Sequence, residues 1–270
     1  MSGLDPDDDL VAGIRTAYDA SARSWSRGPA TVYRCLAAAL VGSCPDPLDG
    51  QVVLDLGAGT GVASEELARV GARSVQMDLA HAMLSVRSGR RPPATVADAR
   101  RIPYRDDGVD AVVSAFCLNH LPDPAVALAE CRRVTRPGGL VLASTYPLDA
   151  EHPAKAAVEQ ALVEVGYQRP DWYRSLKARA APHTGDPESL TRCAATAGLV
   201  DIAVDHLQVD AGVDVPAVAV DWRLDMPHTA GFVAGLDPDR RRLLHDASLA
   251  ALEGELPSTI GVLVLRARSI

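Results

Sequence analysis

The sequence predicts an α/β protein with a Rossmann-like, doubly wound sheet of seven strands, mostly parallel with an antiparallel last strand, and with a helical cap. Three observations predict this fold. A glycine-rich turn follows a short apolar strand, strand-like and helix-like segments alternate over residues 51–146, and a long segment separates the last two strand-like segments. Alternation at this spacing implies right-handed crossovers and therefore parallel strands.

The segment before the sheet is expected to be helical. Residues 1–9 are acidic and polar and are expected to lack regular structure. Helices are expected over residues 10–22 and 31–41. Residues 44–50 are rich in proline and aspartate, which indicates a linker into the first strand.

The run VVLDLGAGTG, residues 52–61, combines a strand with a glycine turn. Residues 52–56 are expected to form a buried parallel strand. Gly57, Gly59 and Gly61 let the backbone turn sharply and approach a ligand closely. A helix is expected from Ser64 to Val70, so the turn would deliver a ligand to N–H groups at a helix N-terminus. This arrangement is typical of a nucleotide-type site, and a glycine turn without a ligand is the structural alternative.

Two acidic residues indicate which kind of nucleotide fits. A dinucleotide fingerprint needs a third glycine where this chain has Val62, and Asp55 at the strand end is poorly suited to a pyrophosphate. Asp78, 23 positions later, ends a second expected strand over residues 74–78, where an acid can accept both ribose hydroxyls. A cationic or hydroxyl-rich ligand is therefore favoured, and an NAD(P)-dependent oxidoreductase is a disfavoured alternative.

The rest of the chain completes the sheet. Expected elements are a helix over 81–88, strands over 94–97 and 111–116, a helix over 124–134 and a strand over 139–145. Further helices are expected over 154–165 and 187–197, followed by a strand over 201–209. The last strand, 261–267, is expected to insert antiparallel between its neighbours. Residues 210–258 are too long for a hairpin connection and are expected to form helices that cap the site.

The motifs from residue 18 to 146 occur in an order that resembles a known family. They include DLAHAML at 78–84 and the run from Val96 to Tyr146. The chain resembles class I S-adenosylmethionine-dependent methyltransferases, and most of all the small-molecule group with the ubiquinone/menaquinone C-methyltransferases and the type 11 methyltransferase domain. The resemblance implies S-adenosylmethionine as cofactor and S-adenosylhomocysteine as product. It is weak beyond Pro147.

The resemblance also implies roles for single residues. Asp55, Gly57, Ala58 and Gly59 would line the methionine part of the cofactor, Asp78 would bind the ribose, and Leu79 would pack on the adenine. Met83 matches the ML position of the family's D-x-S-x-x-M-L pattern and is assigned to the cofactor site. Asp98 and Ala99 would read the adenine edge, and Ala115 and Phe116 would form the floor of the pocket. Tyr18, together with Trp25, would cover the cofactor carboxylate. Ala80 departs from the serine that is common in this family.

The resemblance divides the chain into three parts. Residues 1–50 would lid the cofactor, 51–146 would form the cofactor-binding core, and 147–270 would complete the sheet and supply the substrate cap.

Methyl transfer from a sulfonium is an in-line displacement, so the protein mainly aligns the reacting groups. A base is needed only when the nucleophile carries a proton. His120, just past the fourth expected strand, is the candidate catalytic base, with packing as its alternative role, and Asn119 is a candidate to orient the substrate. His152, His183 and His228 are alternative bases that are equally typical of surface or capping positions.

The cap contains an aromatic-rich cluster in a chain with few aromatic residues. It gathers Trp222, Arg223, Met226, His228 and Phe232, and Trp172 and Tyr173 lie upstream. We expect Trp172, Trp222, Arg223 and His228 to wall an apolar acceptor, although a packed cap core is the alternative.

Composition excludes several classes of function. A net charge of −8 without a basic stripe argues against nucleic acid as partner. Five cysteines without C-x-x-C spacing predict neither a disulfide framework nor a metal site. No apolar run is long enough for a membrane span, and a cytoplasmic protein is expected. A monomer or a homodimer is expected.

These observations together predict O-, N- or C-methylation of a small, partly apolar acceptor, in secondary metabolism or quinone-like biosynthesis. The alternative is a cofactor-binding protein of the same fold that catalyses a cyclisation or isomerisation, or that only regulates.

Overall fold

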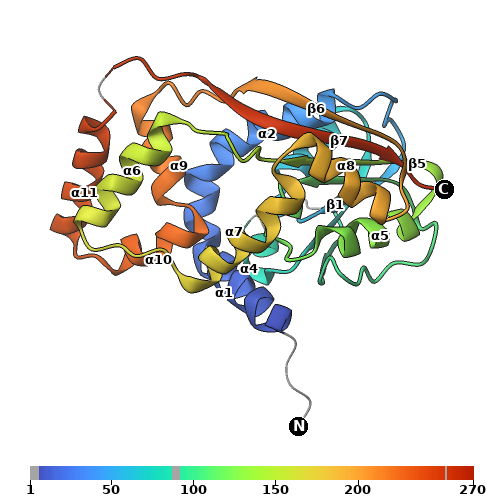
Figure 1. Cartoon of the computed structure of the whole chain (residues 1–270), viewed down its shortest axis with the longest axis horizontal. Coiled ribbons are helices and arrows are strands. Elements are labelled where there is room, and N and C mark those ends of the chain that lie inside the picture. Colours follow the sequence, from blue (N-terminus) through green and yellow to red (C-terminus); the bar gives the residue numbers. More distant parts are fainter. Residues whose placement is uncertain (1–5, 87–91, 253) are drawn as a thin grey trace, which may run out of the picture.

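A computed structural model describes residues 6–86, 92–252 and 254–270 of the chain (Figure 1). Its centre is a seven-stranded sheet in the order β3-β2-β1-β4-β5-β7-β6. The strands are β1 (Val52–Leu56), β2 (Arg73–Asp78), β3 (Ala94–Val96), β4 (Val109–Ala115), β5 (Thr135–Thr145), β6 (Val200–Asp210) and β7 (Thr259–Arg268). Strands β1 to β5 are parallel, and β7 lies antiparallel between β5 and β6. The predicted fold class is therefore confirmed.

Helices cover both faces of the sheet and form a cap at one end. They are α1 (Pro6–Arg27), α2 (Pro29–Gly42), α3 (Val62–Arg69), α4 (His81–Ser85), α5 (Pro124–Val134), α6 (Pro153–Glu164), α7 (Asp171–Thr184), α8 (Pro187–Thr196), α9 (Pro216–Leu224), α10 (Pro227–Gly235) and α11 (Pro238–Ala250), with a short 3-10 helix, η1, at Leu118–His120. Many of them begin at a proline, whose fixed φ suits the first helical turn. None of the described helices combines the length and apolar character that a bilayer span requires.

Alternate side chains along the central strands enter two different cores. Val53 and Val113 pack with residues of α2 and α3, such as Leu36 and Leu67. Leu54 and Val112 point to the other face and belong to the core that includes α5 and α8. A third cluster joins α6, α9 and α11, which lie together at the end of the molecule away from the C-terminus (Figure 1).

Several boundaries differ from those expected. Helix α1 begins at Pro6, so residues 6–9 are helical, since the acidic side chains of the first turn favour the positive end of the helix dipole. Residues 1–5 and the expected helix end at Ser88 lie outside the described residues. Helix α3 begins at Val62 because Gly61, at φ +91°, starts it two residues early. Helix α7 was not predicted, since Pro182 lies inside its last turn.

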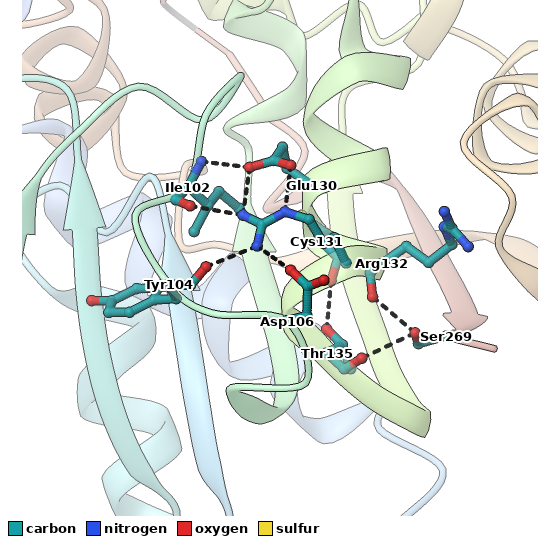
Figure 2. A network of polar contacts seen from close by, with 9 residues as sticks. Ile102, Tyr104, Asp106, Glu130, Cys131, Arg132, Thr135 and Ser269 are labelled. Carbon is teal, nitrogen blue, oxygen red and sulfur yellow. Dashed lines mark hydrogen bonds and ion pairs between the residues drawn. The ribbon is translucent and has the colours of Figure 1, made fainter.

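A partly exposed arginine network fixes the loop that follows β3 (Figure 2). The Arg133 guanidinium on α5 donates to Glu130 and Asp106, and to the carbonyl oxygens of Ile102 and Tyr104, over 2.7–2.8 Å. The Ile102 N–H also donates to the Glu130 carboxylate. These bonds hold residues 102–106 on α5, which steadies the neighbouring edge of the site.

Candidate functional site

The glycine turn has the backbone that the sequence predicted. Gly57, Gly59 and Gly61 all have positive φ, at +71°, +55° and +91°. The N–H groups of Gly57 and Ala58 donate to the carbonyl of Met77 over 2.8 and 3.0 Å, which closes the turn against β2. A Cβ on Gly57 would lie 2.5 Å from the Cys117 Cβ, so this position has no room for a side chain.

Asp55 is fully buried at the end of β1. One carboxylate oxygen accepts from the Ser64 hydroxyl over 2.5 Å, and that hydroxyl accepts from the Gln76 amide over 2.9 Å. The other oxygen has no hydrogen-bond partner among the described residues. Burial raises the pKa of Asp55 to about 6, and the charge of Asp78 adds to the rise. A ligand cation or hydroxyl would satisfy the free oxygen.

Asp78 ends β2 and faces the same turn. One of its oxygens accepts from the Gly59 N–H and the other from the Ala80 N–H, both over 2.8 Å. Burial raises the pKa of Asp78, while these backbone bonds oppose the rise. Because each carboxylate oxygen has a second lone pair, the group can still accept two ribose hydroxyls.

A first cavity lies over this turn. All of the residues that the resemblance assigned to the cofactor line it: Tyr18, Asp55, Gly57, Ala58, Gly59, Asp78, Leu79, Met83, Asp98, Ala99, Ala115 and Phe116, together with Trp25. The cavity measures about 120 Å³, less than the roughly 300–1,000 Å³ of most ligand pockets.

The sequence reasoning missed Arg15 and Cys117, which also line the first cavity. Arg15 lies three residues before Tyr18 on α1, and helical spacing alone places the two on one face. Its guanidinium suits the carboxylate of an amino-acid ligand. Cys117 gave no comparable signal, because its contact with Gly57 joins segments distant in sequence.

Asp98 is already engaged by a neighbouring cation. Its carboxylate accepts from the Arg100 guanidinium over 2.8 and 3.0 Å, and the same guanidinium donates to Asp8 of α1 over 3.0 Å. This chain of contacts ties α1 to the side of the first cavity that Asp98 lines.

A second, larger cavity of about 720 Å³ adjoins the first. Tyr18, Tyr33 and His120 line both cavities. The Tyr18 hydroxyl and His120 Nε2 hydrogen-bond over 2.9 Å, while His120 Nδ1 has no partner among the described residues. Burial lowers the pKa of His120 to about 3, and Lys177 contributes, so the ring is neutral at physiological pH.

The residues proposed for the substrate lie in the second cavity. Its lining includes Asn119, Trp172, Trp222, Arg223 and His228. His228 stacks on Tyr173 with centroids 4.0 Å apart, and burial lowers its pKa well below the ordinary value. His152 also lines this cavity but is occupied by the carbonyl of Pro257, and His183 lines neither cavity.

The structure adds aromatic and charged residues to this lining. Tyr33 and Tyr146 stand near Phe116 at the junction, and Lys155, Arg169 and Lys177 join Arg223. Within the described parts of the chain, no three His, Cys, Asp or Glu side chains form a metal-binding group. The five cysteines are free thiols.

Comparison with known proteins shows the kind of domain. Residues 54–143 match the family model described as a methyltransferase domain. Demethylmenaquinone methyltransferase from Mycolicibacterium paratuberculosis is 38% identical over 137 residues, 51% of this chain and 58% of that protein. The Streptomyces griseus enzyme of the same name is 37% identical over 135 residues, 49% and 57% of the two chains. The match thus spans little more than half the length of these curated relatives.

Solved structures share the fold at low identity. A phosphoethanolamine N-methyltransferase from Haemonchus contortus has a TM-score of 0.56 at 18% identity, over 87% of this chain and 52% of its own. A protein from Anabaena variabilis, named as a methyltransferase of an antibiotic pathway, reaches 0.60 at 16% identity, over 85% and 95%. The cyclase SpnF scores 0.54 at 20% identity, over 87% and 80%. The family match thus shows a methyltransferase domain at residues 54–143, and the sequence of this half of the chain is similar to those of the demethylmenaquinone methyltransferases.

Proposed function

We propose that this protein transfers a methyl group from S-adenosylmethionine to a small acceptor bound in the second cavity. One observation carries the proposal: a cavity built on the glycine turn, Asp55 and Asp78 meets a larger cavity at Tyr18, Tyr33 and His120. That junction is where a cofactor methyl and an acceptor would have to meet.

The bound cofactor supplies a methyl group activated by a positive sulfur. The chain's own residues would bind and orient it. The free oxygen of Asp55 and the carboxylate of Asp78 suit its cationic and hydroxyl groups, and Arg15 suits its carboxylate. The buried aromatic rings at the junction, Tyr33 and Phe116, exclude water from the reacting atoms.

His120 is placed to hold the acceptor rather than to take its proton. A buried imidazole with a pKa of about 3 is a weak base, whereas general bases work best when their pKa is near the working pH. We expect His120→Ala to lower turnover by less than about tenfold, because only positioning is lost. A loss of about a hundredfold or more, with a changed pH profile of turnover, would instead identify His120 as the base.

Composition and the relatives indicate the kind of acceptor, the type of methylation and the cellular setting. The acceptor is a small molecule rather than nucleic acid, since the net charge is −8 and the site is a concave cavity of about 720 Å³. The reaction is O-, N- or C-methylation in secondary metabolism or in quinone-like biosynthesis, as in the demethylmenaquinone methyltransferases. Free thiols fit a cytoplasmic protein, and we propose a monomer or homodimer.

Product analysis tests the reaction class. The purified protein is incubated with S-adenosylmethionine and a panel of phenols, amines and activated methylene compounds, and products are identified by mass spectrometry. Methyl transfer predicts a product heavier by one methylene unit and an equal amount of S-adenosylhomocysteine. An isomeric product without S-adenosylhomocysteine would support the non-methylating alternative.

A further inference from the structure

The second cavity carries more positive charge than an apolar acceptor needs. Lys155, Arg169, Lys177 and Arg223 line it, against the acids Asp149, Glu151 and Glu159. Arg169 is paired with Glu159, and the Lys155 ammonium donates to the carbonyl of Ala150 over 2.8 Å.

Two of these cations have neither a carboxylate partner nor a hydrogen-bonded carbonyl among the described residues. Among the described residues, neither Lys177 nor Arg223 forms an ion pair. The Lys177 ammonium lies 5.8 Å from the centroid of the Tyr173 ring, and the Arg223 guanidinium lies 5.2 Å from that of Trp222. Both cations therefore rest on aromatic faces on the wall of the cavity and remain free to meet an anion.

The charges repel one another at close range. The pKa of Lys155 is lowered to about 8, mainly by burial, and repulsion from Arg223 and Lys177 outweighs attraction to Glu151 and Glu159. The pKa of Lys177 is lowered as well, by burial and then by Arg223 and Arg169. The local potential is thus positive even though the whole chain is acidic.

An unused hydrogen-bond donor lies on the same wall. The Trp222 side chain is only 3% exposed, and its indole N–H has no partner among the described residues. A buried N–H without an acceptor is costly, unless a ligand oxygen satisfies it. This second observation is independent of the charges, and an acceptor atom of a ligand in the cavity would satisfy the indole N–H.

We infer that the acceptor of this enzyme carries an anionic group, a carboxylate or a phosphate ester, held by Lys177, Arg223 and the indole N–H of Trp222. The inference rests on the proposed function, because it names the acceptor class of the same site. The cations line the second cavity and not the first, so they are assigned to the acceptor and not to the cofactor carboxylate, for which Arg15 is available.

Calorimetry with matched probes tests this assignment on the full-length protein saturated with S-adenosylhomocysteine. The probes are 2-naphthoate, 2-naphthyl phosphate and the neutral 2-naphthamide. At least one anionic probe is expected to bind ten times or more tightly than the amide, with affinity falling as salt rises. The preferred anion identifies the group. Equal affinity for the amide and both anions would overturn the inference.

Variants locate the anion. Arg223→Gln and Lys177→Gln should each lower the affinity for the anionic probe about tenfold or more and leave the affinity for the amide unchanged. Arg223→Lys should retain part of the affinity for the anionic probe. Arg240→Gln, on the exposed face of α11, is the control for loss of one positive charge. Unchanged probe binding in both cavity variants would contradict the assignment.

Binding of S-adenosylhomocysteine is measured separately in each variant. If the wild-type protein does not bind S-adenosylhomocysteine, the proposed function is refuted. If only Arg223→Gln and Lys177→Gln bind S-adenosylhomocysteine more weakly, and both still bind the anionic probe as the wild type does, these cations serve the cofactor. That result would overturn the inference but leave the proposed function standing.

Discussion

Asp78 holds the glycine turn closed before any ligand arrives, because its two oxygens accept from the backbone N–H groups of Gly59 and Ala80. Asp78→Asn is nearly isosteric, but it removes the charge and places an NH2 group, which cannot accept, against the N–H of Gly59 or of Ala80. We expect S-adenosylhomocysteine to bind more weakly by about 1.5–3 kcal/mol, the range for hydrogen bonds to charged groups. Calorimetry measures the change, with the surface variant Asp239→Asn as control. Unchanged affinity would place the ribose elsewhere.

His120 makes the stability of the fold sensitive to acid. Its pKa is lowered to about 3 in the folded chain, so the unfolded chain binds more protons between that pH and about 6.5, and stability falls as pH falls through this window. At pH 5 the effect of one such histidine is about 2 kcal/mol.

The variant His120→Gln, which can still bond to Tyr18, should lose less stability between pH 7 and 5 than the wild type. Urea unfolding at both pH values measures the difference. Asp55, whose raised pKa acts in the opposite direction, is common to both proteins and cancels. Equal losses would show that His120 is protonated in the fold.

Among the elements, the strand–turn–helix unit of β1 and α3 leaves no room for a side chain at Gly57. Gly57→Ala forces an L-residue to φ +71° and drives a Cβ into Cys117. The conformation alone costs about 1–2 kcal/mol, and the clash adds to it. Gly42→Ala, at the end of α2 with no atom near the added Cβ, should be neutral or stabilising by up to about 1 kcal/mol. Urea midpoints compare the two, and equal effects would contradict the turn geometry.

Helix α1 is tied to the cofactor side by side chains rather than by the sheet. Asp19 accepts from the Ala82 N–H at the start of α4 over 2.7 Å. Asp19→Ala removes this cap, worth about 1 kcal/mol, and should speed S-adenosylhomocysteine release severalfold in stopped-flow displacement. Thr16→Ala on the same helix, whose hydroxyl bonds only within α1, is the control. Equal release rates would show that α1 does not lid the cofactor.

Most elements followed from local sequence patterns. Short apolar runs predicted the strands of the core, and the antiparallel last strand was predicted in its observed position. The exception was α7, since a proline near its end obscured fourteen helical residues. Local patterns also cannot show which face of a helix meets which cavity.

On the scale of the whole molecule, the first cavity was predictable from the sequence and the second was only partly so. The glycine turn and the two acids, Asp55 and Asp78, lie close together in the sequence, and they predicted where the first cavity would be. The second cavity unites Tyr33, Tyr146, Lys177 and Arg223, which are far apart in the sequence and come together only in the folded chain. The sequence therefore suggested an apolar acceptor, while the folded cavity adds a cationic wall.

The central claim is that the first cavity binds S-adenosylmethionine. Calorimetric titration of the purified protein with S-adenosylmethionine and, separately, with S-adenosylhomocysteine tests it most directly. The structure predicts micromolar binding of both, weakened by Asp78→Asn and unaffected by Arg240→Gln. Absence of binding by either ligand, or binding of a nicotinamide dinucleotide in their place, would contradict it.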